Sequence, residues 1–217
     1  MRQFIVIGLG RFGRSLARAL AEAGHEVLGV DLKEHRAHEL AGILTHTVQA
    51  DATDEDVLVS LGVRNFDVAV VGIGEDIHAS LLITLLLKQH GVRYVVAKAQ
   101  SSLHGRVLER IGADRVVYPE RDMGARVAHN LMAEDILDYI ELSPDVSMVE
   151  VVAHGKLADK TLRQLELRAR YGVNVVAVKH GDRVATAPKA DEVVHEGDIL
   201  LVIGGNEGIR KLEAGRG

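Results

Sequence analysis

The sequence predicts an α/β protein with a doubly wound parallel sheet and a second, smaller α+β domain. Short apolar runs alternate with segments of helical periodicity through the first 120 residues, and a glycine-rich motif directly follows the first run. Such alternation is typical of βαβ units, whose strands are parallel. After Pro119 the rhythm changes, because β-rich runs no longer alternate evenly with helices. This change marks the start of the second part.

The expected elements of the first part follow from the apolar pattern. Several of the runs are apolar at nearly every position, as strands buried on both faces are. We expect strands at Phe4–Gly8, Glu26–Val30, His46–Ala50, Val68–Ile73, Tyr94–Ala97 and Arg115–Tyr118. Helices are expected at Leu16–Ala23, Glu34–Leu40, Asp54–Leu61, Ile77–His90 and Ser101–Ile111. Four glycines lie where helices should stop: Gly24, Gly62, Gly91 and Gly112. The predicted strand order is 3-2-1-4-5-6.

The second part contains fewer and less regular elements. One more helix is expected from Asp122 to about Asp138, followed by a turn at Ser143-Pro144-Asp145. Beyond it we expect strands at Met148–Val152, Val173–Lys179, Arg183–Ala185 and Ile199–Ile203, with helices at Thr161–Arg170 and Glu207–Leu212. His180-Gly181-Asp182 reads as a hairpin turn between two of these strands.

Composition excludes several classes of function. The net charge of −5, with 3% aromatic residues and no tryptophan, argues against a nucleic-acid partner. The absence of cysteine excludes disulfides, thiol nucleophiles and thiolate metal sites. No apolar stretch reaches the roughly 18 residues that span a bilayer, and the N-terminus lacks a secretory pattern. A cytosolic protein, or a cytosolic subunit of a larger system, is therefore expected.

The glycine-rich motif is Gly8-Leu9-Gly10-Arg11-Phe12-Gly13, a G-x-G-x-x-G between a predicted strand and a predicted helix. Gly8 permits the tight turn, Gly10 lets a pyrophosphate approach the backbone, and Gly13 allows close helix–strand packing. Asp31 ends the second strand 18 residues after Gly13, where a carboxylate can accept hydrogen bonds from ribose hydroxyls. Together they predict a Rossmann-like nucleotide site, and Asp31 disfavours a 2′-phosphate.

Two basic residues could contact the nucleotide, and the sequence lacks the common catalytic motifs. Arg11 is either an ordinary surface arginine or an anion contact, and Lys98 is either a solvated lysine or a side chain facing the crevice. There is no G-x-x-x-x-G-K-[ST] or G-x-S-x-G motif, and most of the eleven histidines fall on predicted helix ends or surfaces, among them His35, His38, His90, His104 and His129. The part after the sheet is too small for a usual substrate domain. The nucleotide is therefore expected to be sensed rather than consumed, and the protein is not expected to be an enzyme.

The chain resembles the cytosolic regulatory subunits of Ktr/Trk potassium-uptake systems, which are RCK proteins. The resemblance covers essentially the whole chain, from the glycine motif and Gly24–Asp31 through Asp51-Ala52-Thr53 and Lys98-Ala99-Gln100. It extends to Ile111-Gly112-Ala113-Asp114 and Pro119–Gly124. It implies three regions: an RCK_N domain at 1–121, a crossover and dimerisation helix with linker at 122–142, and an RCK_C domain at 143–217.

The resemblance also implies roles for individual residues. Asp31 would hold the ribose, Asp51-Ala52-Thr53 would border the adenine, and Arg11 would reach terminal phosphates. Glu120 would bind a cation (Mg²⁺, Ca²⁺ or Na⁺) between paired nucleotides, although it could equally be a capping acid of the next helix. Asp76 replaces an asparagine often seen in Ktr proteins, which leaves the nucleotide preference open. The full expected nucleotide site is Gly8, Gly10, Arg11, Phe12, Gly13, Asp31, Leu32, Lys33, Asp51, Ala52, Thr53, Ile73, Gly74, Lys98 and Glu120.

Assembly and a second ligand are implied in the same way. The helix after the sheet would cross between protomers through Met123, Val127, Leu131 and Met132, giving homodimers that assemble into an octameric ring, although an intramolecular docking face would look the same. In several relatives the RCK_C domain binds cyclic di-AMP. Residues near the matching positions are Arg168, Asn174, Val175, His180 and Pro188.

The sequence therefore predicts a nucleotide-sensing gating subunit that binds ATP or ADP, with NAD(H) as a possible ligand, and controls a separate membrane K⁺-translocating subunit. It would lie at the inner face of the cell membrane through that partner. An NAD(H)-dependent oxidoreductase or NAD-responsive regulator is the main alternative, since it would share the glycine motif and Asp31. The regulatory part of a cation antiporter or channel is a third hypothesis.

Overall fold

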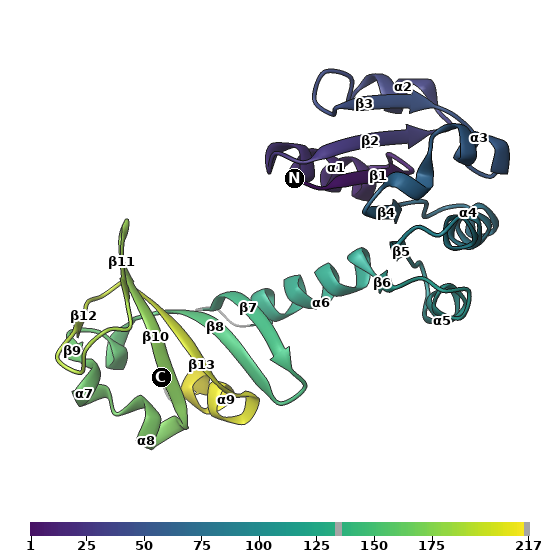
Figure 1. Ribbon diagram of the computed structural model, residues 1–217. Helices are drawn as coiled ribbons and strands as arrows, with labels where there is room; N and C mark the ends of the chain where they lie inside the picture. Colours follow the sequence, from purple (N-terminus) through teal and green to yellow (C-terminus); the bar gives the residue numbers. More distant parts are fainter. Residues whose placement is uncertain (133–135, 215–217) are drawn as a thin grey trace. The chain divides into compact units, whose positions relative to one another are not determined.

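The computed structural model describes residues 1–132 and 136–214. The chain divides into two compact units, Met1–Glu120 (unit 1) and Arg121–Gly217 (unit 2), each with its own sheet (Figure 1).

Unit 1 is a parallel α/β layer structure. Its six-stranded sheet has the order β3-β2-β1-β4-β5-β6, all parallel, which confirms the predicted order. The strands are β1 (Gln3–Ile7), β2 (Glu26–Asp31), β3 (His46–Gln49), β4 (Val68–Val71), β5 (Tyr94–Lys98) and β6 (Arg115–Val117). The helices are α1 (Arg11–Glu22), α2 (Glu34–His38), α3 (Glu55–Ser60), the short 3₁₀ helix η1 (Val63–Asn65), α4 (Ile77–Gln89) and α5 (Ser102–Arg110).

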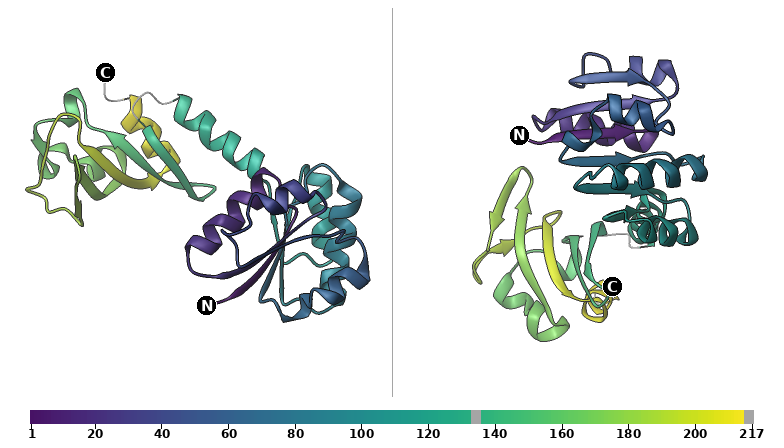
Figure 2. Two further views of the ribbon diagram at one scale, coloured as in Figure 1. Left: turned by 90° about the horizontal axis from the view of Figure 1, so that it is seen from above. Right: turned by 45° about the vertical axis from the view of Figure 1, so that its right-hand side comes forward.

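Helices cover both faces of this sheet (Figure 2). In β1, Ile5 and Ile7 join the apolar core formed with α3, α4 and α5, whereas Phe4 and Val6 join the core formed with α1 and α2. Successive strand residues point to opposite faces, so a strand buried on both sides needs apolar residues throughout. This is why every residue from Phe4 to Ile7 is apolar.

The helix boundaries have local causes. Asp54, Asp76 and Ser101 each accept a hydrogen bond from a backbone N–H of the first turn of the helix that follows. Gly24, Gly62, Gly91 and Gly112 follow the ends of α1, α3, α4 and α5 with φ between 67° and 103°, as predicted. After Gly112, Asp114 accepts from Lys88 Nζ at 2.8 Å and from Val95 N at 2.7 Å, which ties the start of β6 to α4 and β5.

Unit 2 contains a five-stranded antiparallel sheet in the order β11-β10-β13-β8-β7 and a separate β12-β9 pair. Its strands are β7 (Ile136–Ser143), β8 (Val146–Val152), β9 (Lys160–Thr161), β10 (Val173–His180), β11 (Arg183–Thr186), β12 (Val193–Val194) and β13 (Ile199–Gly205). Its helices are α6 (Pro119–Met132), whose first two residues belong to unit 1, the 3₁₀ helix η2 (Gly155–Leu157), α7 (Leu162–Leu165), α8 (Leu167–Tyr171) and α9 (Asn206–Ala214).

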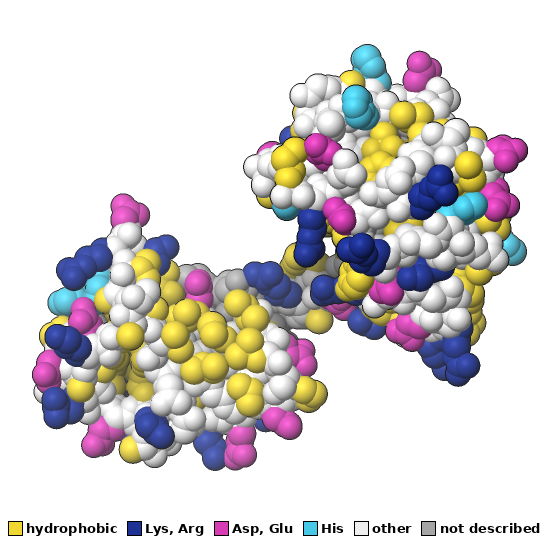
Figure 3. Space-filling model, viewed as in Figure 1, with side chains coloured by type: hydrophobic (Ala, Val, Ile, Leu, Met, Phe, Trp, Pro, Cys, Tyr) yellow, Lys and Arg dark blue, Asp and Glu magenta, His cyan; other side chains and the backbone are white. Residues whose placement is uncertain are grey.

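The two faces of this sheet differ. One face carries Val149, Val151, Leu200 and Val202 into an apolar core shared with leucines of α7, α8 and α9. The opposite face carries apolar residues that remain partly accessible, and Figure 3 shows yellow side chains gathered over β8 and β13. Met148, Val152, Ile199, Leu201 and Ile203 alternate with the core residues and are only half-buried.

Two expectations for unit 2 were wrong. The helix predicted to reach Asp138 ends at Met132, and Ile136–Ser143 is β7, which pairs with β8 around a two-residue turn at Pro144-Asp145. The helix predicted at Thr161–Arg170 is broken into α7 and α8 by Glu166, whose φ is +47°. This left-handed residue lets Leu165 and Leu167, two positions apart, both enter the core. Among the described residues, no helix is long and apolar enough to cross a membrane.

Candidate functional site

A crevice of about 660 Å³ opens at the carboxyl ends of β1, β2, β4 and β5. Ligands of doubly wound sheets bind at this edge, where the strand order reverses. The structure brings together here nearly all residues predicted for the nucleotide: Gly8, Gly10, Arg11, Phe12, Asp31, Leu32, Lys33, Asp51, Ala52, Thr53, Ile73, Gly74, Lys98 and Glu120. Gly13 is the exception, since it is buried beneath the lining.

The three motif glycines have different physical requirements. Gly8 has φ +91°, and a Cβ there would lie 2.8 Å from Ile73 Cγ1. A Cβ on Gly13 would lie 1.9 Å from the Gly8 carbonyl oxygen, so no side chain fits. A Cβ on Gly10 would meet nothing closer than Arg36 Nη1 at 4.0 Å. Gly8 and Gly13 are therefore required by the fold, whereas the space at Gly10 is open to a ligand.

Gly72, at the end of β4, completes this turn and was not predicted. A Cβ on Gly72 would lie 2.8 Å from the Gly8 carbonyl oxygen and 3.3 Å from Gly13 Cα. The close approach of the β1–α1 turn to β4 therefore needs a glycine on both sides. No motif marks Gly72, because its partner is distant in the sequence.

The amino end of α1 faces the crevice through Gly10, Arg11 and Phe12. Gly10 is the N-cap and provides no side-chain hydrogen bond, and the first turn contains no acidic residue. The first backbone N–H groups of a helix have no intrahelical partner and carry the positive end of the helix dipole. The arrangement suits an anion such as a phosphate.

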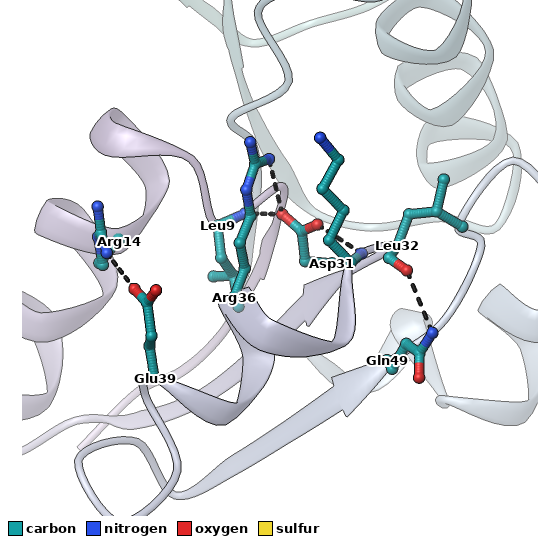
Figure 4. A network of polar contacts seen from close by, with 8 residues as sticks. Leu9, Arg14, Asp31, Leu32, Arg36, Glu39 and Gln49 are labelled. Carbon is teal, nitrogen blue, oxygen red and sulfur yellow. Dashed lines mark hydrogen bonds and ion pairs between the residues drawn. The ribbon is translucent and has the colours of Figure 1, made fainter.

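Asp31 is 5% exposed and already holds the glycine turn in place (Figure 4). Its Oδ2 accepts a hydrogen bond from Leu9 N at 2.7 Å, and its Oδ1 accepts one from Lys33 N at 2.8 Å. Arg36 Nη1 lies 3.5 Å from Oδ2. An ionised carboxylate can accept about four hydrogen bonds, so capacity remains for ribose hydroxyls. Arg36 was not predicted, because nothing in its local sequence marks it.

Asp51 and Thr53 form part of the wall near β3. Thr53 donates to Asp51 Oδ1 from its backbone N at 2.9 Å and from its hydroxyl at 2.6 Å. These two hydrogen bonds stabilise the ionised form and lower the pKa of the Asp51 carboxyl. Ala52 between them is buried in the core of unit 1. The segment thus presents a small, rigid surface to the crevice.

Lys98 and Glu120 form an ion pair at the opposite wall. Lys98 Nζ donates to Glu120 Oε1 at 2.6 Å, and the Lys98 side chain is only 12% exposed whereas that of Glu120 is 64% exposed. The hydrogen bond from Lys98 is the largest effect on the pKa of Glu120 and lowers it, burial opposes this, and the charge of Arg11 adds to the lowering. A Cβ on Gly74 would lie 3.1 Å from Lys98 Nζ, so Gly74 leaves room for the ammonium group.

The remaining lining residues add acidity and polar groups to the rim. Asp76 caps α4 through a 2.9 Å hydrogen bond from Ala79 N, and Glu75 and Gln100 also face the crevice. His104, expected at a helix end or a surface, lies in the first turn of α5 but is buried at 3% exposure. It is buried because Gly105 and Leu108 on the same helix pack inward with it.

The residues predicted for a second ligand lie in unit 2 and do not all come together. Arg168 lies on α8 just before β10, and Asn174 and Val175 lie at the start of β10. Ala187 N donates to Val176 O at 3.0 Å, which places Pro188 beside this part of β10. His180 ends the strand six residues after Asn174, roughly 20 Å away at the usual rise of a strand. His180 instead contacts Asp198 and Glu192.

Comparison with known proteins identifies the family. The TrkA-N domain model matches residues 4–119 and the TrkA-C domain model matches residues 146–214. The Ktr system potassium uptake protein C of Bacillus subtilis is 51% identical over 212 residues, covering 98% of this chain and 96% of that protein. The chain belongs to the TrkA/Ktr family of potassium-uptake proteins. The Ktr system potassium uptake protein A of the same organism is 44% identical over the same shares.

Solved structures support the same fold. The GsuK channel bound to NAD matches all of this chain with a TM-score of 0.68 at 22% identity, and the chain spans 39% of the GsuK chain. GsuK bound to ADP matches 57% of this chain and 32% of the GsuK chain, with a TM-score of 0.50 and 22% identity. Identities this low indicate a shared RCK architecture and no more. The TrkA/Ktr assignment rests on the relatives described above.

Proposed function

We propose that this chain is a nucleotide-sensing regulatory subunit of a potassium-uptake system and is not itself an enzyme. The observation that carries the proposal is the crevice, in which the amino end of α1, the open space at Gly10 and the Asp31 carboxylate converge. Relatives at 51% and 44% identity are named potassium uptake proteins. GsuK, with the same fold, has been solved with NAD and with ADP.

ATP or ADP is the proposed ligand, with NAD(H) as the alternative. The phosphates would lie on the free N–H groups of α1, next to Gly10, with Arg11 reaching the terminal phosphate. Asp31 would accept hydrogen bonds from the ribose, and Asp51-Ala52-Thr53 would border the adenine. The Asp31 charge disfavours a 2′-phosphorylated dinucleotide.

Lys98 would exchange its partner when a nucleotide binds. In the structure the ammonium of Lys98 neutralises Glu120. A phosphate is a stronger competitor for an ammonium than an exposed carboxylate, because it carries more charge. Lys98 would then turn to the phosphate, and the freed Glu120 carboxylate would hold a cation (Mg²⁺, Ca²⁺ or Na⁺) near the nucleotide.

Regulation would act on a separate membrane K⁺-translocating subunit at its cytosolic face. Homodimers assembling into an octameric ring would change shape only if the nucleotides bind two ring conformations with different affinities. Cyclic di-AMP stays a prediction for unit 2, and the structure favours Arg168, Asn174, Val175 and Pro188 over His180 as its neighbourhood.

Gly10→Ala tests the nucleotide site directly. A Cβ at this position meets no protein atom closer than Arg36 Nη1 at 4.0 Å, and Gly10 has φ −65° and ψ −172°, which an alanine adopts readily. The methyl group would occupy the space proposed for the pyrophosphate. We expect ATP, ADP and NAD affinity, measured by isothermal titration calorimetry on the full chain, to fall at least tenfold. The free energy of unfolding should change by less than about 1 kcal/mol.

Gly13→Ala is the matched comparison, because its Cβ collides with the Gly8 carbonyl and should destabilise unit 1 itself. Absence of binding by the wild-type chain for all three nucleotides would refute the proposal. Unchanged affinity in Gly10→Ala would move the phosphates away from α1. Turnover of a nicotinamide cofactor by the chain would favour the oxidoreductase alternative.

A further inference from the structure

Two histidines and an aspartate meet at one end of the unit 2 sheet. His180 ends β10, while His195 and Asp198 lie in the turn that connects β12 to β13. Among the residues that the structure describes, their ligand atoms form a group in which every pair lies within 4.8 Å. The turn is closed by a hydrogen bond from Asp198 N to His195 O at 3.1 Å, with Gly197 at φ +82°.

We propose that His180, His195 and Asp198 form a binding site for a divalent transition-metal ion of the zinc type. A tetrahedral ion with bonds of 2.0–2.1 Å separates its ligand atoms by about 3.3 Å. His195 Nδ1 lies 3.5 Å from Asp198 Oδ2, close to that separation. His180 Nδ1 lies 2.7 Å from the same oxygen, so a rotation that withdraws the ring by about half an ångström admits the ion.

The surroundings of the site support ligation. Glu192 Oε1 lies 3.3 Å from His180 Nε2, the ring nitrogen that would face away from the metal. Metal-binding histidines usually donate this second N–H to a carboxylate, which fixes the ring and makes it a stronger ligand. His195 N donates to Asp198 Oδ2 at 2.6 Å and holds the carboxylate in position. The supporting contacts are therefore present before any ion binds.

Accessibility and donor type indicate which ions fit. The Asp198 side chain is 9% exposed and His180 is 21% exposed, whereas His195 is 63% exposed. An ion can therefore enter past His195, and a water molecule can complete its coordination. Two imidazole nitrogens with one carboxylate oxygen suit Zn²⁺, Ni²⁺, Co²⁺ or Cu²⁺ and disfavour Mg²⁺ or Ca²⁺. The bound ion would link β10 to the β12–β13 turn.

Calorimetric titration of ZnCl₂ into the metal-free full-length protein tests the site. We expect about one ion to bind per chain and the unfolding temperature to rise on addition of Zn²⁺. His195→Ala should weaken binding at least tenfold with little effect on the metal-free protein, because this side chain is largely exposed. Glu192→Gln should weaken binding by about ten- to hundredfold while all three ligands remain.

His38→Ala is the control, since His35 and His38 on α2 of unit 1 form the most obvious competing pair of imidazoles. His38→Ala should leave the Zn²⁺ affinity and the number of ions bound per chain unchanged. The inference is overturned if the wild-type protein binds no Zn²⁺, if His195→Ala retains wild-type affinity, or if His38→Ala abolishes binding. In the first of these outcomes, His180 is only hydrogen-bonded to the Asp198 and Glu192 carboxylates and holds no metal. The nucleotide titration is independent of all of them.

Discussion

His104 lies almost wholly inside unit 1, at 3% exposure, where a charged ring would lose its hydration. Gln100 N donates to its Nδ1 at 3.4 Å, and its Nε2 is buried with no hydrogen-bond partner among the described residues. Burial lowers the pKa of the ring from its ordinary value of 6.5. Below that pH the unfolded chain therefore binds a proton that the folded chain does not, and the free energy of unfolding falls as the pH falls.

His104→Leu should reduce this loss of stability in acid. The free energy of unfolding from urea titrations should decrease between pH 7.5 and pH 5.5 by less in the variant than in the wild-type chain. The substitution also removes the acceptor of Gln100 N, but that cost is the same at both pH values. Equal losses in the two proteins would mean that His104 is not responsible.

Residues whose roles depend on local geometry were predictable from the sequence. The glycine turn and the acid that ends β2 lie in one continuous βαβ unit, where spacing fixes their positions. Gly72 and Arg36 were missed because their contacts, with Gly8 and Asp31 respectively, depend on how separate elements pack. The side chains of Lys98 and Glu120 could be assigned to one wall only through the resemblance, since 22 residues separate them in the sequence.

At the level of elements, α9 packs closely on the end of α8. A Cβ on Gly208, in α9, would lie 2.3 Å from the Tyr171 carbonyl oxygen, so the two elements can approach only where α9 has no side chain. Backbone atoms cannot move aside as a flexible side chain can. The packing of α9, which brings Ile209 and Leu212 into the core of unit 2, therefore depends on this residue.

Gly208→Ala should lower the free energy of unfolding of unit 2 by about 1–3 kcal/mol, the usual cost of overpacking. Gly124→Ala is the matched control, because Gly124 is also helical and its Cβ would meet nothing within 4 Å. Alanine favours a helix over glycine, so the control should be neutral or stabilising by up to about 1 kcal/mol. Chemical denaturation monitored by circular dichroism measures the free energy of unfolding of both variants and of the wild-type chain. A neutral Gly208→Ala would show that α8 and α9 can separate at no cost.

Most elements of unit 1 were predictable, because α1, α3, α4 and α5 end at a glycine and the last three of these also begin at a side-chain cap. In unit 2 the local apolar spacing conflicted with the long-range packing. The segment Ile136–Ser143 continues an apolar spacing that also fits a helix, and only its pairing with β8 makes it a strand. Likewise, the predicted helix divides at Glu166 because Leu165 and Leu167 both enter the core of unit 2. No local sequence pattern predicts this division. Long-range packing decided both cases.

At the level of the whole molecule, α6 presents an apolar stripe that unit 2 does not cover. Met123, Val127 and Leu131 recur every four residues and are 56%, 47% and 81% exposed. The side chain of Met132, predicted to join them, lies outside the described residues. Such a stripe on a charged helix is typical of an interface. It supports the proposed pairing of protomers.

Leu131→Asp should therefore reduce the mass of the assembly, because it places a charge within the proposed contact, at the most exposed residue of the stripe. Light scattering coupled to size-exclusion chromatography at micromolar concentration measures the effect. Leu131→Met keeps the position apolar and should retain the wild-type mass. If the Leu131→Asp chain assembles as the wild type does, the stripe is not the interface.

Asp31 both holds the glycine turn and, as proposed, binds the ribose, and this limits how nucleotide preference can be redesigned. Because the carboxylate accepts from Leu9 N, it holds the glycine turn in its binding shape before a ligand arrives. Replacing it to admit a 2′-phosphate would also release that turn. Lys33 and Arg36 flank the same position without bonding the turn themselves. A change of cofactor specificity in this scaffold would therefore have to begin at those two residues and leave Asp31 in place.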